Sequence, residues 1–219
     1  MGLVFKKQLD TKTAIGLWRI EENAENLLSR LQLKDHETDT LTALSDGKRK
    51  LQWLSTRVLL RYMLGDPAYI DCRIDEHGKP YLENFPYSIS LSHSFDYAAV
   101  MVSEDKDVGI DIELISTKIE RIEGKFMKPE ELAFISPLNR TEHLYICWCT
   151  KEAIYKLQGK QGVSFKDHIH LKSFGFKDVG SFEASFETPN LCRMFTVHYE
   201  KFENYMIGYC ASERLRDEK

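Results

Sequence analysis

The stretch Trp53–Gly65, which reads WLSTRVLLRYMLG, has a relative later in the chain at Trp148–Gly159, which reads WCTKEAIYKLQG. Each begins with Trp, places Thr before a basic residue, continues with helix-forming residues and ends at Gly. In the first stretch, Leu54, Val58 and Tyr62 follow the period of an α-helix. A glycine at the end favours the left-handed conformation that terminates many helices. The pattern therefore predicts two related helices.

A second pair of related segments follows these helices along the chain. The segment FDYAAVMVS spans residues 95–103, and FENYMIGYCAS spans residues 202–212. Both open with an aromatic residue, pass through a polar turn and continue as an apolar run of strand-forming residues. Because both pairs occur in the same order, we predict a duplicated helix-plus-hairpin unit. The fold class is then α+β, with an N-terminal half at 1–105, a C-terminal half at 106–219 and a ligand site in the crevice between them.

The composition narrows the class of protein. The chain has 219 residues, of which 42% are hydrophobic and 29% are charged, which is an ordinary globular balance. A net charge of -4 provides no overall basic field for nucleic acid. The five cysteines lack the spacing of a disulfide framework or a zinc site, as is typical of reduced thiols in the cytosol. Without a signal peptide or an apolar run of about 18 residues, we expect a cytoplasmic protein that neither crosses a membrane nor binds nucleic acid.

Two acidic residues lie in the apolar segment VGIDIE at residues 108–113. The β-branched residues predict a short strand, whose period of two places Asp111 and Glu113 on the same face. Two carboxylates on one face repel each other unless a cation or a proton separates them. Oxygen ligands at this spacing suit a hard ion such as Mg²⁺. The alternative is a half-exposed strand that shows two solvated acids.

The later predicted helix carries a carboxylate and an ammonium group on one face. Trp148, Glu152 and Lys156 are spaced i, i+4 and i+8, so they share a side of the helix. Lys151 lies about 100° away and is predicted to reach a neighbouring part of the same site. The alternative is an ordinary Glu–Lys pair on a solvated helix.

Three further segments offer groups to an anion. SLSHS at 90–94 supplies hydroxyls and His93, and its alternative is a turn with capping serines. A serine hydrolase is disfavoured there, because adjacent strand residues point to opposite faces and no G-x-S-x-G elbow is present. Lys79 and Pro80 lie in GKPY at 78–81, which is either a hairpin loop or a surface against a flat base. The basic run Lys48–Lys50, with Arg57 and Arg61 further along the same helix, could offer positive charge to an anion, and its alternative is a solvated basic face.

In combination, the segments GIDIE and WCTKEAIYK resemble the paired signatures of the 4′-phosphopantetheinyl transferases, and GKP and SHS occur in the same order as in that family. The resemblance is to the larger, single-chain branch and covers roughly Lys48 to Lys156. It implies two similar α/β halves related by a pseudo-twofold axis, with the active site in the cleft between them. It also implies a monomer, because the second half supplies what a partner subunit would.

The resemblance further implies an enzyme of the holo-[acyl-carrier-protein] synthase type. Such an enzyme transfers the 4′-phosphopantetheine group of coenzyme A to a serine of an acyl or peptidyl carrier protein and releases 3′,5′-ADP. These carriers serve fatty-acid, polyketide or non-ribosomal peptide biosynthesis. Two other functions remain open from the residues. One is a magnesium-dependent nucleotide hydrolase, and the other is a non-catalytic module that binds coenzyme A and a carrier protein.

Carried over by motif, the resemblance assigns roles to particular side chains. The metal, Mg²⁺ or alternatively Mn²⁺, falls to Asp111, Glu113 and Glu152. The remaining contacts are with coenzyme A. Its diphosphate falls to Lys151 and Lys156, and further phosphate oxygens fall to Ser92 and His93. Its adenine end falls to Lys79 and Pro80, and its 3′-phosphate to Arg49, with Gln52 as the alternative if the register differs. The catalytic group is then Glu152 with Lys156 and Asp111, and Glu152 is the hypothesised base for the carrier serine.

A carrier protein is typically acidic, so a docking face with basic or apolar character is expected. The segment Lys118–Lys128 interleaves basic residues with Ile119, Ile122, Phe126 and Met127. It is a candidate for that face. The alternative is an amphipathic helix that packs these apolar groups into its own core.

Overall fold

Two antiparallel sheets form the centre of the molecule. The computed structural model describes residues 2–44 and 47–214. The first sheet has four strands in the order β1-β2-β6-β5 and the second has five in the order β7-β11-β10-β9-β8. The strands of the first are β1 (Leu3–Gln8), β2 (Thr13–Arg19), β5 (Ser88–Ser94) and β6 (Tyr97–Ser103). Those of the second are β7 (Lys106–Leu114), β8 (Ile169–Leu171), β9 (Val179–Thr188), β10 (Leu191–Phe202) and β11 (Tyr205–Glu213).

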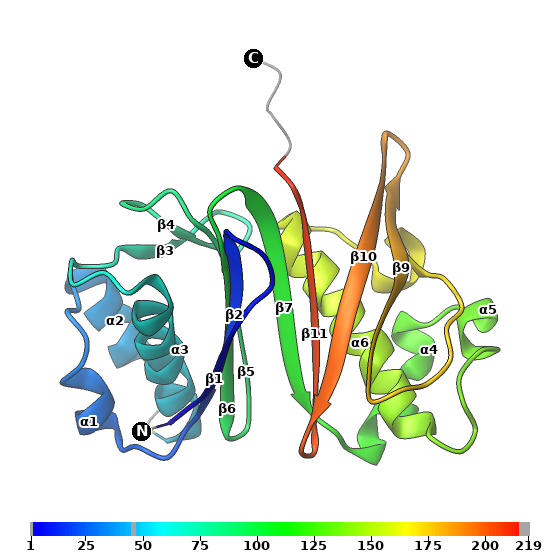
Figure 1. The fold of residues 1–219 in the computed structure, drawn as a ribbon, viewed down its shortest axis with the longest axis horizontal. Coiled ribbons are helices and arrows are strands. Elements are labelled where there is room, and N and C mark those ends of the chain that lie inside the picture. The colour runs from blue at the N-terminus through cyan, green and yellow to red at the C-terminus, as the bar shows by residue number, and fades with distance from the viewer. Residues whose placement is uncertain (1, 45–46, 215–219) are drawn as a thin grey trace.

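Helices cover the outer face of each sheet, as Figure 1 shows. On the first sheet they are α1 (Ala24–Leu28), α2 (Asp35–Ala43) and α3 (Lys48–Leu64), and α3 packs against β2 and β6. On the second sheet α6 (Arg140–Gln158) packs against β7 and β11. The short elements around α6 are the 3₁₀ helix η1 (Thr117–Arg121), α4 (Glu123–Phe126), α5 (Pro129–Leu132) and α7 (Phe165–His168). A small hairpin of β3 (Cys72–Ile74) and β4 (Pro80–Leu82) projects from the first half.

The predicted helix-plus-hairpin unit occurs twice. In the first sheet β2 is followed by α3 and the β5–β6 hairpin, and in the second β7 is followed later by α6 and the β10–β11 hairpin. In both sheets the last strand of the hairpin pairs with the strand that precedes the helix, giving β2-β6-β5 and β7-β11-β10. Gly65 and Gly159 end the two helices with φ values of 65° and 61°. Both helices and their glycine caps are therefore confirmed.

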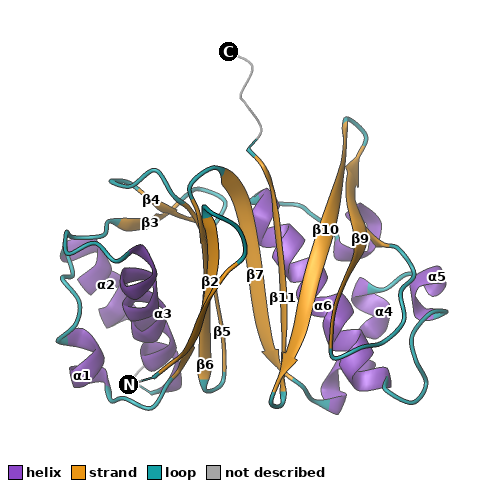
Figure 2. Cartoon of the chain, in the orientation of Figure 1, coloured by secondary structure: helices purple, strands orange, loops and turns teal. Residues whose placement is uncertain are grey.

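Apolar residues form three layers of core between these elements. The first lies between α3 and the first sheet, and the second lies between α6 and the second sheet. The third joins the two sheets through side chains such as Ile15, Met101, Ile110 and Ile207. The order of layers is thus helix, sheet, sheet, helix (Figure 2). Because β6 is covered on both faces, all of its residues are buried.

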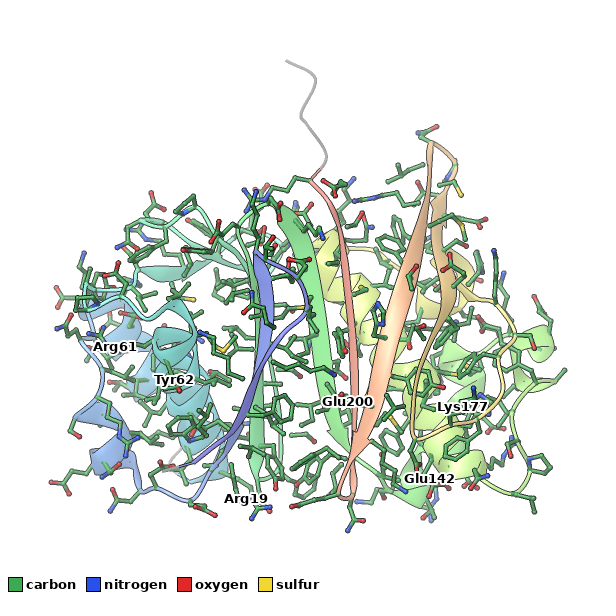
Figure 3. All side chains as sticks on the ribbon, viewed as in Figure 1. Arg19, Arg61, Tyr62, Glu142, Lys177 and Glu200 are labelled. Atoms are coloured by element: carbon green, nitrogen blue, oxygen red, sulfur yellow. The ribbon has the colours of Figure 1, made fainter. Side chains whose placement is uncertain are left out.

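Polar contacts reinforce the junction of the sheets. The Tyr97 hydroxyl accepts a hydrogen bond from Arg19 and donates one to Glu203 (2.9 Å), which lies in the β10–β11 turn. Lys7 of β1 reaches Glu200 of β10 at 2.8 Å. Arg19 and Glu200 are labelled in Figure 3. Groups from both halves of the chain therefore meet in one contiguous structure.

For three segments, the structure decides between alternatives that the sequence left open. The segment 90–94 is not a turn with capping serines, because it forms the last five residues of β5. In the segment 118–128 the alternative of core packing is confirmed for Ile119, Phe126 and Met127, which are buried in the core of the second half, whereas Ile122 is partly buried. In the segment 78–81, Gly78 (φ 89°) and Lys79 lie in the β3–β4 hairpin turn, and Pro80 and Tyr81 begin β4. Among the described residues, no helix combines the length and apolarity needed to cross a membrane.

Candidate active site

The acidic residues of β7 face α6 because the strand alternates. Val108, Ile110 and Ile112 point into the core between the sheets. Residues of the opposite parity, Asp111 and Glu113, therefore lie on the other side of the strand. This confirms the predicted strand with both acids on one face. The face is covered by a helix, so the alternative of two freely solvated acids is wrong for Asp111, which is only 3% exposed.

Glycines allow α6 to approach the sheet closely. A Cβ atom on Gly109 would lie 1.9 Å from the backbone oxygen of Ala153. On the neighbouring strand β11, a Cβ on Gly208 would lie 2.9 Å from the backbone of Cys149. The glycine of the GIDIE segment is thus explained by helix–sheet packing. As a consequence, the next turn of the helix carries Glu152 and Lys156 beside Asp111.

Asp111 is held by two side chains. Its Oδ1 accepts hydrogen bonds from Lys156 Nζ (2.7 Å) and from Ser92 Oγ (2.8 Å). Lys156 Nζ also donates to the Ile110 carbonyl at 3.2 Å. The second oxygen, Oδ2, is buried without a hydrogen-bond partner among the described residues. An unpartnered buried carboxylate oxygen is costly unless a proton or a cation meets it.

The two neighbouring acids, Glu152 and Glu113, have raised pKa values because they are buried close to another negative charge. Burial, followed by repulsion from Asp111, raises the pKa of Glu152 to about 7. Burial and Asp111 also raise the pKa of Glu113, although hydrogen bonds from Ser94 and Trp148 oppose the rise. A crowded set of acids with raised pKa values favours a bound cation or proton, and such sets concentrate at functional sites.

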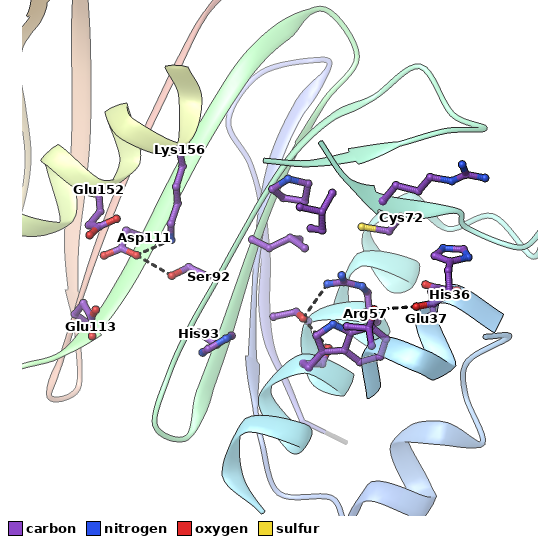
Figure 4. Close-up of a pocket in the computed structure, with 17 residues that line it drawn as sticks. His36, Glu37, Arg57, Cys72, Ser92, His93, Asp111, Glu113, Glu152 and Lys156 are labelled. Carbon is purple, nitrogen blue, oxygen red and sulfur yellow. Dashed lines mark hydrogen bonds and ion pairs between the residues drawn. The ribbon is translucent and has the colours of Figure 1, made fainter. Parts of the chain in front are cut away.

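A pocket of about 810 Å³ opens beside these acids, between β7 and α6 on one side and the N-terminal half on the other. Figure 4 shows the two walls facing each other. Seven of the residues singled out from the sequence line it: Pro80, Ser92, His93, Asp111, Glu113, Glu152 and Lys156. The structure therefore brings the β5, β7 and α6 motifs together in one place.

The opposite wall contains groups that were not assigned to the site from the sequence. His36 and Arg73 line it together with Arg57, whose guanidinium lies 4.6 Å from the centre of the Trp53 ring. The Nε of Arg57 is buried without a hydrogen-bond partner among the described residues. The only sequence signal was the position of Arg57 in the basic stretch that begins at Lys48, which does not distinguish a pocket residue from a solvated one.

Lys151 does not reach the pocket. Its amine is fully buried on another side of α6 and contacts both oxygens of Glu131 at 3.0 and 2.8 Å. It also donates to the carbonyls of Phe165 and Ile169 at 3.0 and 2.8 Å. All three of its protons are thereby engaged within the core. The step of about 100° from Glu152 turns this lysine toward the interior rather than toward the acids.

Two other predicted contacts lie at the margins. Lys79 donates to the Leu157 carbonyl at 2.7 Å, which ties the β3–β4 hairpin to the last turn of α6, and it lines a smaller adjoining pocket of about 360 Å³. Arg49 is exposed on the first turn of α3, close enough to His93 for its charge to help lower the pKa of that imidazole, after burial and Lys156. Gln52 instead donates to the Phe95 carbonyl (3.1 Å).

The residues present fit a hard divalent cation by their chemistry. Asp111, Glu113 and Glu152 supply carboxylate oxygens, which are the ligands that Mg²⁺ prefers. The unpartnered Oδ2 of Asp111 is an available donor atom. Within residues 2–44 and 47–214, no set of three His, Cys, Asp or Glu side chains is already assembled around one point as metal ligands. Lys156 supplies one positive charge at Asp111.

The fold and the pocket describe an α+β protein whose acidic and basic groups suit a phosphate-bearing ligand and a cation. A family model of the 4′-phosphopantetheinyl transferase superfamily matches residues 107–210. A 4′-phosphopantetheinyl transferase of Bacillus subtilis is 31% identical over 152 residues, which cover 67% of this chain and 65% of that protein. The transferase AcpT of Escherichia coli strain K12 is 32% identical over 120 residues, or 52% of this chain and 60% of that protein. The transferase HetI of a Nostoc species is 25% identical over 174 residues, or 72% and 73%.

The chain belongs to the 4′-phosphopantetheinyl transferase superfamily. The family match contains both β7, with its two acids, and α6, with Glu152 and Lys156. The chain spans less than two thirds of the length of the first two relatives, at 65% and 60%.

Proposed function

We propose that this protein transfers the 4′-phosphopantetheine group of coenzyme A to a serine of an acyl or peptidyl carrier protein and releases 3′,5′-ADP. The observation that carries the proposal is the set of three carboxylates next to Lys156 in the 810 Å³ pocket between the two halves. The names of the relatives support the same reaction. The proposal includes three alternative pathways for the carrier: fatty-acid, polyketide or non-ribosomal peptide synthesis.

In the proposed reaction the hydroxyl oxygen of the carrier serine attacks the phosphorus that bears pantetheine. The bond from that phosphorus to the oxygen of the ADP portion breaks, and the departing phosphate takes the electron pair. Magnesium, held by Asp111, Glu113 and Glu152, would neutralise charge on the phosphate oxygens. Lys156 lies beside these acids and would stabilise the same developing charge. Since positioning and electrostatics dominate phosphoryl transfer, no covalent enzyme intermediate is required.

Glu152 is the proposed acceptor of the serine proton. Without a bound cation, burial and repulsion from Asp111 raise its pKa to about 7. A cation held beside Glu152 would lower that pKa and favour the carboxylate, which is the form that accepts a proton. On the opposite wall, Arg57 offers positive charge to the anionic parts of coenzyme A. Arg73 and His36 line the same wall but already contact Asp71, at 3.1 and 3.3 Å. Arg49, near His93 at the start of α3, is proposed to meet the 3′-phosphate, and Lys79 and Pro80 are proposed to border the adenine end.

The proposed carrier-docking surface is basic rather than apolar. Lys118, Arg121 and Lys125 are exposed on η1 and α4. Between them, Ile119 is buried and Ile122 is partly buried. η1 begins three residues after β7 ends, so this surface follows directly from the strand that carries the acids. A row of exposed cations complements an acidic carrier despite the net charge of -4.

The release of 3′,5′-ADP tests the reaction against its main alternative. The protein is incubated with coenzyme A and magnesium, with and without an apo carrier, and the nucleotide products are separated by chromatography. A transferase releases 3′,5′-ADP only when the carrier with its serine is present. Equal release with a Ser→Ala carrier or with no carrier would identify a nucleotide hydrolase instead. If the protein binds coenzyme A but releases no 3′,5′-ADP with any apo carrier, the result would favour a non-catalytic binding module.

A further inference from the structure

Every second residue of β5 is a serine, in the sequence SISLSHS of Ser88–Ser94. The hydroxyl oxygens of Ser90, Ser92 and Ser94 accept hydrogen bonds from backbone N–H groups of β7. The donors are Ile110, Ile112 and Leu114, at 3.0, 3.2 and 3.1 Å. β5 and β7 are edge strands of different sheets. Serine hydroxyls thus take the place that carbonyl oxygens occupy in an ordinary sheet.

Two of these serines also bind the acids of the candidate active site. Ser92 Oγ donates to Asp111 Oδ1, and Ser94 Oγ donates to Glu113 Oε2, both at 2.8 Å. A hydroxyl has one proton to donate, so each of these serines commits its proton to a carboxylate and a lone pair to the backbone of β7. Ser90 makes the backbone contact but donates to no carboxylate within the described part of the chain.

The two contacts differ in what surrounds them. Ser92 lines the pocket, so a substitution there would change the substrate's surroundings as well as the carboxylate. Ser94 is 6% exposed and is not among the residues that line the pocket. It reaches Glu113 from the N-terminal half of the chain, whereas Glu113 belongs to the C-terminal half. Trp148 of α6 also donates a hydrogen bond to Glu113. Without Ser94, that hydrogen bond and the charge of Lys156 would be left to oppose repulsion from Asp111.

We propose that Ser94 is a positioning residue that orients Glu113 for binding the divalent cation, so that the N-terminal half sets the geometry of a metal site whose ligands all lie in the C-terminal half. This inference rests on the proposed function for the identity of the reaction. The requirement for the hydroxyl at Ser94 is a separate claim about metal binding. A hydrogen-bond partner of a metal ligand typically contributes about 10–100-fold to metal affinity.

The test compares Ser94→Ala with Ser90→Ala, which removes the same kind of contact to β7 without touching a carboxylate. Mn²⁺ binding to the full chain, with coenzyme A present, is measured by electron paramagnetic resonance. Ser94→Ala is expected to weaken Mn²⁺ binding by roughly 10–100-fold, as loss of such a partner does elsewhere. Ser90→Ala is expected to bind Mn²⁺ as the unchanged protein does. Ser94→Thr, which keeps the hydroxyl, is expected to restore most of the affinity.

Urea unfolding of both alanine variants measures how much each substitution lowers the free energy of unfolding, separately from Mn²⁺ binding. If Ser94→Ala does not fold, Ser94→Cys replaces it, because a thiol fills the site but is a weak donor. Unchanged Mn²⁺ affinity in the folded Ser94 variant would overturn the proposal, as would an equal loss in Ser90→Ala or no Mn²⁺ binding by the unchanged protein. Tight Mn²⁺ binding without transfer to any carrier would instead contradict the proposed function and leave the role of Ser94 measurable.

Discussion

Glu152 and Lys151 are adjacent in the sequence yet have opposite environments. Glu152 lines the pocket, and its carboxyl has a pKa raised to about 7. Lys151 is completely buried and paired with Glu131. One position on the helix therefore separates a group suited to proton transfer from a group that organises the core. Each environment leads to a distinct prediction.

The first prediction concerns pH. The pKa of Glu152 is about 7 in the folded chain against an ordinary value of 4.5, so between these pH values the folded state binds the proton more tightly than the unfolded state. Stability is therefore lost as pH rises through this window. In EDTA, Glu152→Gln should be more stable than the unchanged protein at pH 8, and the difference should shrink at pH 5. Thermal unfolding at both pH values measures this, and a difference independent of pH would contradict it.

The second prediction concerns Lys151. Lys151→Met leaves the Glu131 carboxylate buried without its cation, which should cost about 3–5 kcal/mol of unfolding free energy. Adding Glu131→Gln should recover part of the loss, because the remaining buried group is neutral. Coenzyme A binding, measured by calorimetry at low temperature where the variant is folded, should be unchanged. Normal stability combined with weakened coenzyme A binding would show instead that Lys151 contacts the substrate.

At the scale of elements, η1 and α4 have one buried and one exposed side. Phe126 and Met127 pack into the second core, and Arg121 and Lys125 face solvent. Arg140 of α6, in contrast, is paired with Glu123 at 2.7 Å. Docking through this surface should therefore depend on charge.

Reversing two of these charges gives the third prediction. Arg121→Glu with Lys125→Glu should raise the KM for an acidic carrier by roughly tenfold at low salt, and the effect should diminish as salt increases. The KM for coenzyme A should not change. A matched control is Lys172→Glu with Lys177→Glu, which changes the net charge equally at exposed positions before β9. Equal effects of the two double variants would contradict docking at η1 and α4.

The elements themselves were largely predictable from the sequence, because helix periodicity and terminal glycines are local signals. The face shared by Asp111 and Glu113 followed from strand alternation in the same way. The contacts that complete the site are not local. Ser94 meets Glu113 through the packing of two sheets, and Arg57 enters the pocket only when α3 is placed opposite β7. The sequence did not show that Lys151 faces the interior, because either Lys151 or Lys156 could have faced the pocket.

At the scale of the whole molecule, the halves are joined by a shared core and by the serine contacts between β5 and β7. Ile110 and Ile112 of β7 pack against residues of the first sheet such as Ile15 and Met101. The pseudo-twofold relation of the halves and the division at 105/106 stay predictions. The shared core nevertheless means that neither half buries its apolar surface alone.

The fourth prediction follows from this shared core. A fragment of residues 106–219 retains the proposed metal ligands but exposes the apolar face of β7 and β11, so it should not fold cooperatively by itself. Circular dichroism during heating should show no sharp transition for the fragment, in contrast to the full chain. Adding the 1–105 fragment should restore the transition if the halves reassociate. A cooperative transition of 106–219 alone would contradict the role given to the shared core.

The most direct test of the central claim is the intact mass of an apo acyl carrier protein after incubation with this protein, coenzyme A and magnesium. We expect a gain equal to one phosphopantetheine group on the carrier serine, which is lost with EDTA or with Asp111→Ala. Circular dichroism of the Asp111→Ala variant checks that it remains folded. An unchanged mass for every apo acyl and peptidyl carrier tested, or a gain that persists with Asp111→Ala and EDTA, would contradict the account.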